Sequence, residues 1–238
     1  MRDNSGKEIV RALEKRIEKM DGVPAWVRRA FRSGLGSLRK RGIVTVSAMR
    51  SAIADETLPP RVRSSACAMI RLLGDKGAAR LLLSTLDKAA SLELTWEIAK
   101  TLVAISGKRV RAGLLRRLHH TFERDRAIVY ALGNLAELRA VRALIAKLSD
   151  TSNLPGLRGQ AAEALGQIGG RRALNALISA TRDKAMEVRF WSTFALGRIG
   201  DKRATAALEA VRDGDKARLR GWGSLKHEAE EAIASLWR

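Results

Sequence analysis

The stretch that decides the fold is ALGRIGDKRA, at residues 195–204. Its two glycines, Gly197 and Gly200, and its basic pair, Lys202 and Arg203, suggest at first a loop that holds a phosphate group. A dinucleotide-binding loop, however, needs Gly-x-Gly-x-x-Gly after a strand, and a Walker loop needs Gly-x-x-x-x-Gly-Lys followed by Ser or Thr. Neither spacing is present. We therefore interpret the stretch as a turn between two helices.

Related stretches recur along the chain at a nearly constant spacing. Residues 162–183 match residues 193–213 closely, and looser copies lie at 68–87, 100–118 and 129–150. Spacings of 32, 30, 33 and 31 residues separate the equivalent apolar positions, which are Ile70, Leu102, Leu132, Leu165 and Leu196. Such a period is typical of solenoid proteins, in which each unit buries its apolar face against the next.

Each unit is predicted to contain two helices. In the last full unit, apolar residues at helical spacing predict a first helix over about 188–199. Gly200 is expected to end it in the left-handed conformation, and Asp201 to cap a second helix over about 203–211.

The pattern Val-Arg…Ala-Leu-Gly-x-Ile-Gly-Asp-x-Arg-Ala resembles HEAT-like repeats of the short, phycobilin-lyase-related type, over roughly residues 61–238. The resemblance implies an all-α, right-handed α-solenoid (α-α superhelix) of five repeats. It also implies that first helices lie on the convex side and that second helices line the concave side. It says little about activity, because such repeats serve lyases, hydroxylases, DNA glycosylases and plain scaffolds.

The two ends of the chain depart from the repeat. Residues 1–60 are predicted to form a helical N-terminal cap with helices at about 7–20, 24–41 and 45–54. The last residues are predicted to form a C-terminal half-repeat. We expect one continuous domain, composed of this cap and a solenoid over 61–238, because a solenoid needs its open ends covered.

Composition narrows the classes of function. The formal net charge of +20 predicts attraction to polyanions such as nucleic acid. The single cysteine, Cys67, excludes an internal disulfide and a cysteine-based zinc cluster. The charged N-terminus contains no signal-peptide core, and no apolar run approaches the roughly 18 residues needed to span a bilayer. We therefore expect a cytoplasmic protein with no membrane partner.

No enzymatic motif emerges from the sequence. The three histidines, His119, His120 and His227, are too few for the di-iron centre of the hydroxylases in the resembling family. The repeat-built DNA glycosylases place Trp and Asp near the damaged nucleotide, and the nearest candidates here, Trp96 and Trp191, are predicted to lie in the core. No motif specific to bilin lyases is evident. We expect no catalytic residue, no metal and no cofactor.

Basic residues concentrate in three places. In the first, residues 24–42, Trp26, Val27, Ala30, Phe31 and Leu35 are expected to form a buried stripe. The second is a predicted helix over 108–124. Opposite its apolar face lies a stripe of five basic residues, Arg109, Arg116, Arg117, His120 and Arg124. The resemblance places this stripe in the concave groove. The third is the series of inter-helix turns, which includes Lys76 and Arg139. The candidate nucleic-acid-binding residues are Arg28, Arg29, Arg32, Arg39, Lys40, Arg41, Lys108, Arg109, Arg116, Arg117, His120, Arg124, Arg171, Arg172, Lys202 and Arg203.

Another recurring basic position is assigned to structure. Arg63, Arg158 and Arg189 stand at the starts of first helices, and Asp183 precedes Arg189 by six residues. This spacing resembles the Asp–Arg ladder that joins adjacent HEAT units.

These patterns predict a non-enzymatic protein that binds the nucleic-acid backbone through a basic concave surface. Contacts from Lys and Arg to phosphate would be only weakly selective for sequence. Two alternatives stay open: a scaffold that grips an acidic protein partner, and a HEAT-repeat DNA glycosylase.

Overall fold

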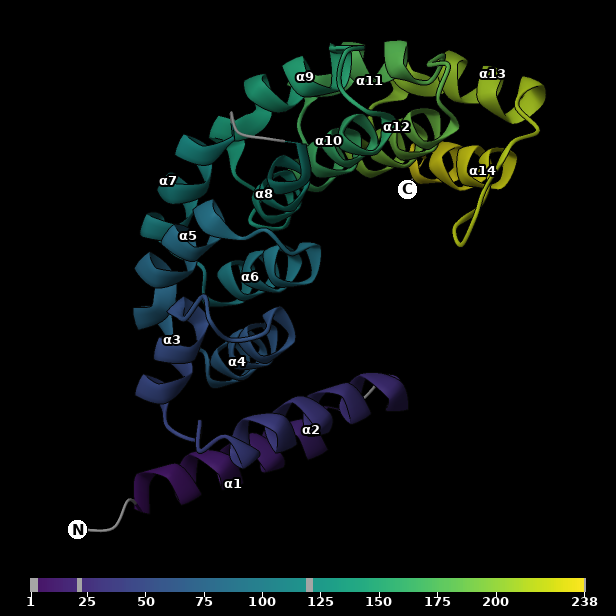
Figure 1. Cartoon of the computed structure of the whole chain (residues 1–238). Helices are drawn as coiled ribbons and strands as arrows, with labels where there is room; N and C mark the ends of the chain where they lie inside the picture. Colours follow the sequence, from purple (N-terminus) through teal and green to yellow (C-terminus); the bar gives the residue numbers. More distant parts are fainter. Residues whose placement is uncertain (1–3, 21–22, 119–121, 238) are drawn as a thin grey trace. The chain divides into compact units, whose positions relative to one another are not determined.

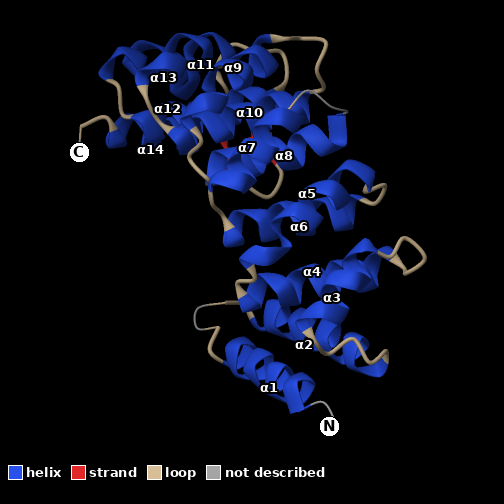
Figure 2. Cartoon of the chain, turned by 90° about the vertical axis from the view of Figure 1, so that its left-hand side faces the viewer, coloured by secondary structure: helices blue, strands red, loops and turns tan. Residues whose placement is uncertain are grey.

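The computed structural model describes residues 4–20, 23–118 and 122–237, and almost all of them lie in helices joined by short loops (Figures 1 and 2). The residues group into two compact units, Met1–Gly113 and Leu114–Arg238. The division falls within helix α7 (Lys108–Arg117), so the N-terminal cap helices share a unit with the first repeats.

The first unit is a stack of helices around α4. Helices α1 and α2 of the cap, helix α3 and helix α6 all pack against α4. Helix α3 also contacts α5, and so extends the layer of second helices. The elements are α1 (Asn4–Glu18), α2 (Ala25–Lys40), α3 (Val46–Ala54), α4 (Pro60–Leu73), η1 (Lys76–Ala78), α5 (Ala79–Lys88) and α6 (Leu92–Ile105).

The second unit repeats one motif: a first helix, a 3-10 turn and a second helix. The elements are α8 (Phe122–Asn134), η2 (Leu138–Ala140), α9 (Val141–Ser149), α10 (Pro155–Ile168), η3 (Arg171–Ala173), α11 (Leu174–Ala180), α12 (Met186–Ile199), η4 (Lys202–Ala204), α13 (Thr205–Gly214), the two-stranded hairpin β1 (Arg218–Leu219) and β2 (Gly223–Ser224), and α14 (Leu225–Ser235). Across the described residues, five helix pairs run from α4/α5 to α12/α13, and α14 supplies the half-repeat. The predicted α-solenoid is therefore confirmed.

Glycines bring the first helices of the second unit into close contact. A Cβ atom at Gly133 would lie 2.8 Å from Cα of Ala164, and one at Gly166 would lie 2.6 Å from Cα of Ala195. The second helices contact one another much less. Helices α8, α10, α12 and α14 consequently lie on the inner side of this unit's curve, and α9, α11 and α13 lie on its outer side (Figure 1). The prediction that second helices line the concave side is wrong for this unit.

The turn at residues 200–204, between α12 and α13, has the predicted geometry. Gly200 ends α12 with a φ of 69°, in the left-handed region where glycine is favoured. A side-chain oxygen of Asp201 accepts a hydrogen bond of 3.1 Å from the backbone N–H of Arg203 and so caps η4.

Adjacent repeats are joined by the predicted Arg–Asp ladder. Arg158 in α10 donates to Asp183 before α12, and to the backbone oxygen of Leu148. One repeat later, Nε of Arg189 lies 2.5 Å from Oδ2 of Asp215. The first of these pairs is almost fully buried. Each arginine therefore ties its own repeat to the turn that begins the next one.

Two local predictions are corrected. The predicted helix over 108–124 is not continuous: α7 ends at Arg117, and Phe122 already belongs to α8. The buried apolar residues from Ala127 onwards belong to α8, the first helix of the next repeat. Residues 122–124 are part of α8 and therefore do not extend the second helix α7. In the cap, Phe31 and Leu35 are buried as predicted and Val27 is half-buried. Ala30 is exposed and Trp26 is 71% exposed, because the buried residues of α2 begin only at Phe31.

Candidate nucleic-acid interface

The turns between first and second helices of the second unit place cations at one end of the stack. Each turn follows the C-terminal end of a first helix, so η2, η3 and η4 share one edge of this unit. Five exposed residues at these turns form what we call the basic edge: Arg139, Arg171, Arg172, Lys202 and Arg203. Two of the three turns carry a doubled basic pair.

Carboxylates that cap the turns neutralise part of this edge. Nε of Arg139 lies 2.8 Å from Glu137, and Nη2 of Arg203 lies 2.8 Å from Asp201. The bonds from Arg203 hold the pKa of the Asp201 carboxyl well below its usual range, so this residue is charged wherever the protein is folded near neutral pH. The basic edge therefore carries two fixed negative charges among its five cations.

The η3 turn differs from its neighbours, because a glycine replaces the capping acid. Gly170 precedes η3 with a φ of 93° and offers no side chain to the turn. Arg171 instead reaches Asp201 of the next turn, with Nε 3.3 Å from Oδ2. Within the part of the chain that the structure describes, Arg172 has no ion-pair partner. The positive charge of the edge is therefore least compensated at η3.

One further cation of the basic edge interacts with an aromatic ring. Nζ of Lys202 lies 4.1 Å from the ring centroid of Trp237, a cation–π contact that follows the end of α14. The ring itself remains largely exposed. Lys202 thus keeps its charge at the surface without a carboxylate beside it.

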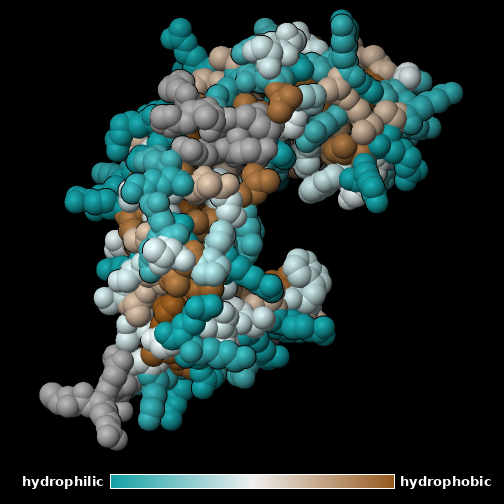
Figure 3. All heavy atoms as spheres, viewed as in Figure 1, coloured by the Kyte–Doolittle hydropathy of each residue, from teal (hydrophilic) through white to brown (hydrophobic). Residues whose placement is uncertain are grey.

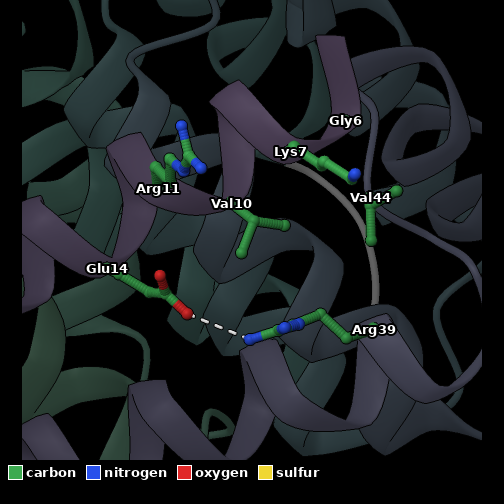
Figure 4. Close-up of a pocket in the computed structure, with 7 residues that line it drawn as sticks. All are labelled: Gly6, Lys7, Val10, Arg11, Glu14, Arg39 and Val44. Atoms are coloured by element: carbon green, nitrogen blue, oxygen red, sulfur yellow. Dashed lines mark hydrogen bonds and ion pairs between the residues drawn. The ribbon is translucent and has the colours of Figure 1, made fainter. Parts of the chain in front are cut away.

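The predicted cations of α2 divide into bound and exposed residues. Nη1 of Arg39 lies 3.0 Å from Oε1 of Glu14, at a pocket of about 330 Å³ between α1 and α2 that Lys7 and Arg11 also line (Figure 4). Arg28 donates to the backbone oxygen of Met20. Four predicted residues stay exposed on and after this helix: Arg29, Arg32, Lys40 and Arg41.

The predicted stripe of α7 is not assembled as one surface. Lys108, Arg109 and Arg116 are exposed, whereas Arg117 is half-buried and has an interaction partner. His120 lies outside the described residues. Arg124 belongs to α8 and not to α7, so the five-residue stripe expected on one helix is wrong.

The first unit contains a groove that the sequence did not indicate. It has a volume of about 380 Å³ and lies between α2, α4 and α6. Trp26 and Phe31 line it from α2, Met69 lines it from α4, and Glu93 lines it from α6. Trp26, which was predicted to be buried, is an exposed residue of this groove.

The described part of the chain was expected to hold neither a metal site nor a reactive cysteine. Among residues 4–20, 23–118 and 122–237, no three metal-ligating side chains lie close enough to hold an ion. Burial raises the pKa of the Cys67 thiol, which makes it a poor nucleophile. Trp191 is buried as predicted, and Trp96 is half-buried.

Hydrophilic side chains cover much of the face seen in Figure 3, with hydrophobic residues scattered between them. In the described residues, none of the helices combines the length and the apolar character that crossing a bilayer requires.

Comparison with known proteins identifies the repeat. Residues 122–194 and 141–225 match the family of HEAT repeats. The complex of CpcE and CpcF of phycocyanin lyase from Nostoc sp. PCC7120 is similar in structure, with 17% sequence identity, a TM-score of 0.50, and coverage of 97% of this chain and 94% of that one. A designed armadillo repeat protein in complex with the peptide (KR)4 has 18% identity and a TM-score of 0.53, with coverage of 94% and 99%. Among curated proteins, none has a matching sequence.

Proposed function

Because residues 122–225 match the family of HEAT repeats, we propose that this chain is a non-enzymatic binding protein that holds a nucleic-acid strand by its phosphates at the basic edge. The observation that carries the proposal is the η3 turn, where Gly170 stands in place of a capping acid, so that Arg171 shares Asp201 with the next turn and, in the described residues, Arg172 has no ion-pair partner. Arginine contacts phosphate oxygens with two parallel hydrogen bonds, which suits it to a regularly spaced backbone.

The chemistry of the site supports binding over catalysis. The polar groups of the edge are cations, capping carboxylates and backbone groups, and the edge lies on exposed turns. Contacts of this kind are made to the backbone, so we expect weak selectivity for base sequence and a strong dependence on salt. The net charge of +20 adds long-range attraction to the same class of partner.

The direct experiment is a titration of the whole chain with labelled duplex and single-stranded oligonucleotides at about 50 and 200 mM salt. The proposal expects binding at the lower concentration and a loss of affinity at the higher one. Absence of binding at 50 mM salt would rule the proposal out.

A protein scaffold is the second candidate, favoured by the groove between α2, α4 and α6. Trp26 and Phe31 supply an apolar lining, and the same helix α2 carries the exposed cations Arg29 and Arg32, which suit an acidic segment. The similar armadillo protein holds a peptide, and the similar lyase is a complex of two proteins. A pull-down treated with nuclease separates the candidates, because a protein partner survives that treatment and a nucleic acid does not.

A further inference from the structure

The connection between α13 and α14 forms a small hairpin that the basic edge does not include. Strands β1 and β2 pair Arg218 with Ser224 and Leu219 with Gly223. A tight turn closes the hairpin: the N–H of Trp222 donates to the backbone oxygen of Leu219 at 2.9 Å, and Gly221 has a φ of 84°. Because it joins a second helix to a first helix, it lies at the opposite end of the helices from the basic edge (Figure 1).

Both ends of the hairpin are fixed to the helices. Asp215, just before it, accepts a hydrogen bond from Arg189 of α12, with 2.5 Å between Nε and Oδ2. Ser224, at its end, caps α14 by accepting from the N–H of His227 at 3.2 Å. The N–H of Leu225 also donates to the backbone oxygen of Ala217 at 3.0 Å. The hairpin is thus held in one place and does not behave as a free loop.

Its tip holds an aromatic ring in an exposed position. The ring of Trp222 lies 4.7 Å from that of Trp191, at 71° to it, and the side chain remains 64% exposed. Trp191 is itself fixed, because it is buried and makes edge contacts with Phe190 and Phe194. An edge-to-face contact orients the ring of Trp222 without covering most of its surface.

The hairpin and the residues just before it carry exposed basic side chains. Lys216, Arg218 and Arg220 are exposed within six residues of Trp222. The carboxylate of Asp215 is engaged by Arg189, and the hydrogen bonds from Arg189 and from the N–H of Ala217 keep the pKa of Asp215 low. An oriented aromatic face on a hairpin that also carries two exposed arginines suits one nucleobase and its adjacent phosphates.

We propose that this hairpin binds single-stranded nucleic acid, with one base stacked on Trp222 and the adjacent phosphates near Arg218 and Arg220. A base within a duplex is already stacked on both faces, so only an unpaired base can offer its face to the ring. The inference rests on the proposed function for its class of ligand, but it assigns a different site and narrows the ligand to single strands.

The test compares the whole chain with Trp222→Ala and Trp222→Phe. Each protein is titrated with a single-stranded oligonucleotide, with the same strand carrying abasic positions in place of bases, and with a duplex. We expect Trp222→Ala to weaken binding of the intact single strand by about 5- to 150-fold, the range typical of one stacked base. Trp222→Phe is expected to retain part of the affinity, and the abasic strand to bind all three proteins nearly equally.

Several outcomes would overturn the inference and leave the proposed function standing. In the first, the unaltered chain and Trp222→Ala bind the intact single strand with equal affinity. In the second, Trp222→Ala loses as much affinity for the abasic strand as for the intact strand. If the unaltered chain binds no oligonucleotide, the proposed function and this inference fail together. The abasic strand changes only the ligand, so the test does not depend on how well a variant folds.

Discussion

Arg171 and Asp201 belong to successive turns and are joined across the repeat boundary, with Nε 3.3 Å from Oδ2. Asp201 also binds Arg203, within its own turn. One carboxylate therefore restrains two arginines of the basic edge, and it does so because Gly170 leaves Arg171 without an acid in its own turn.

This arrangement predicts that Asp201→Asn increases affinity for nucleic acid. Asparagine keeps the cap on η4, because its side-chain oxygen accepts the same backbone hydrogen bond, but it removes the negative charge. We expect tighter binding of an oligonucleotide at low salt, and a salt dependence steeper by up to about one unit for each arginine released. Weaker binding by a variant of unchanged thermal stability would contradict the role given to this carboxylate.

The Arg–Asp ladder predicts a large loss of stability from Arg158→Ala. This change leaves the carboxylate of Asp183 buried without its partner and removes the hydrogen bond to Leu148. Breaking a buried ion pair from one side costs about 3–5 kcal/mol of the free energy of unfolding. Chemical denaturation measures this loss in the free energy of unfolding. The matched control is Lys184→Ala, at an exposed residue of the same turn region. Equal denaturation midpoints for the two variants would contradict the prediction.

Close packing of the first helices predicts that Gly166→Ala destabilises the second unit. The added Cβ would lie 2.6 Å from Cα of Ala195, so α10 and α12 must separate. Overpacking of this kind costs about 1–3 kcal/mol. Gly214→Ala is the control, because no atom lies within 4 Å of a Cβ there, and alanine is the better helix former. A melting temperature of Gly166→Ala at or above that of the unaltered chain would be incompatible with this packing.

Glu163 in α10 predicts a specific dependence of stability on pH. Burial raises the pKa of its carboxyl, although Gln160 donates a hydrogen bond to it. An acid whose pKa is raised on folding favours the folded state when protonated, so its charged form is unfavourable at pH 7. Glu163→Gln is therefore expected to raise the melting temperature at pH 7, with the gain shrinking as the pH falls towards the usual carboxyl pKa. The exposed Glu209→Gln should show no such trend.

Much of the fold could be predicted from the sequence, because the repeat encodes it redundantly. Gly200 and Asp201 specify the helix end and the cap, and equivalent positions recur in the other units. The Arg–Asp ladder was predicted from the six-residue spacing of Asp183 and Arg189, and the structure forms its pairs between repeats, Arg158 with Asp183 and Arg189 with Asp215. Local signals of this kind act within a few residues and so can be read without knowing the packing.

What escaped prediction depends on packing between helices. The side of the curve on which first helices lie is set by contacts such as that of Gly166 with Ala195, which no single repeat reveals. The break after Arg117 carries neither glycine nor proline to mark it. The spacing of Trp26 fits the apolar stripe of α2. It is exposed because the buried residues of that helix begin only at Phe31.

The candidate interface was predicted in its composition but not in its electrostatics. The doubled pairs at residues 171–172 and 202–203 are candidate binding residues from the sequence, and this stays a prediction. The two pairs differ in how far a carboxylate neutralises their positive charge. This difference depends on Asp201, which contacts Arg203 in its own turn and Arg171 across the repeat boundary. Trp222, which we propose as a stacking residue, is not among the candidates from the sequence, although Arg220-Gly221-Trp222-Gly223 is typical of an aromatic residue in a tight turn.

The most direct test of the account is the salt dependence of oligonucleotide binding by the double variant Arg171→Gln and Arg172→Gln. Glutamine removes both charges without placing a new acid beside Asp201. The matched control, Arg182→Gln with Lys184→Gln, removes two exposed charges from the opposite end of the helices of the same unit. The account predicts that the first variant binds more weakly and loses about one to two units of salt slope, while the control binds nearly as the unaltered chain does. Equal affinity and slope in both variants would contradict it.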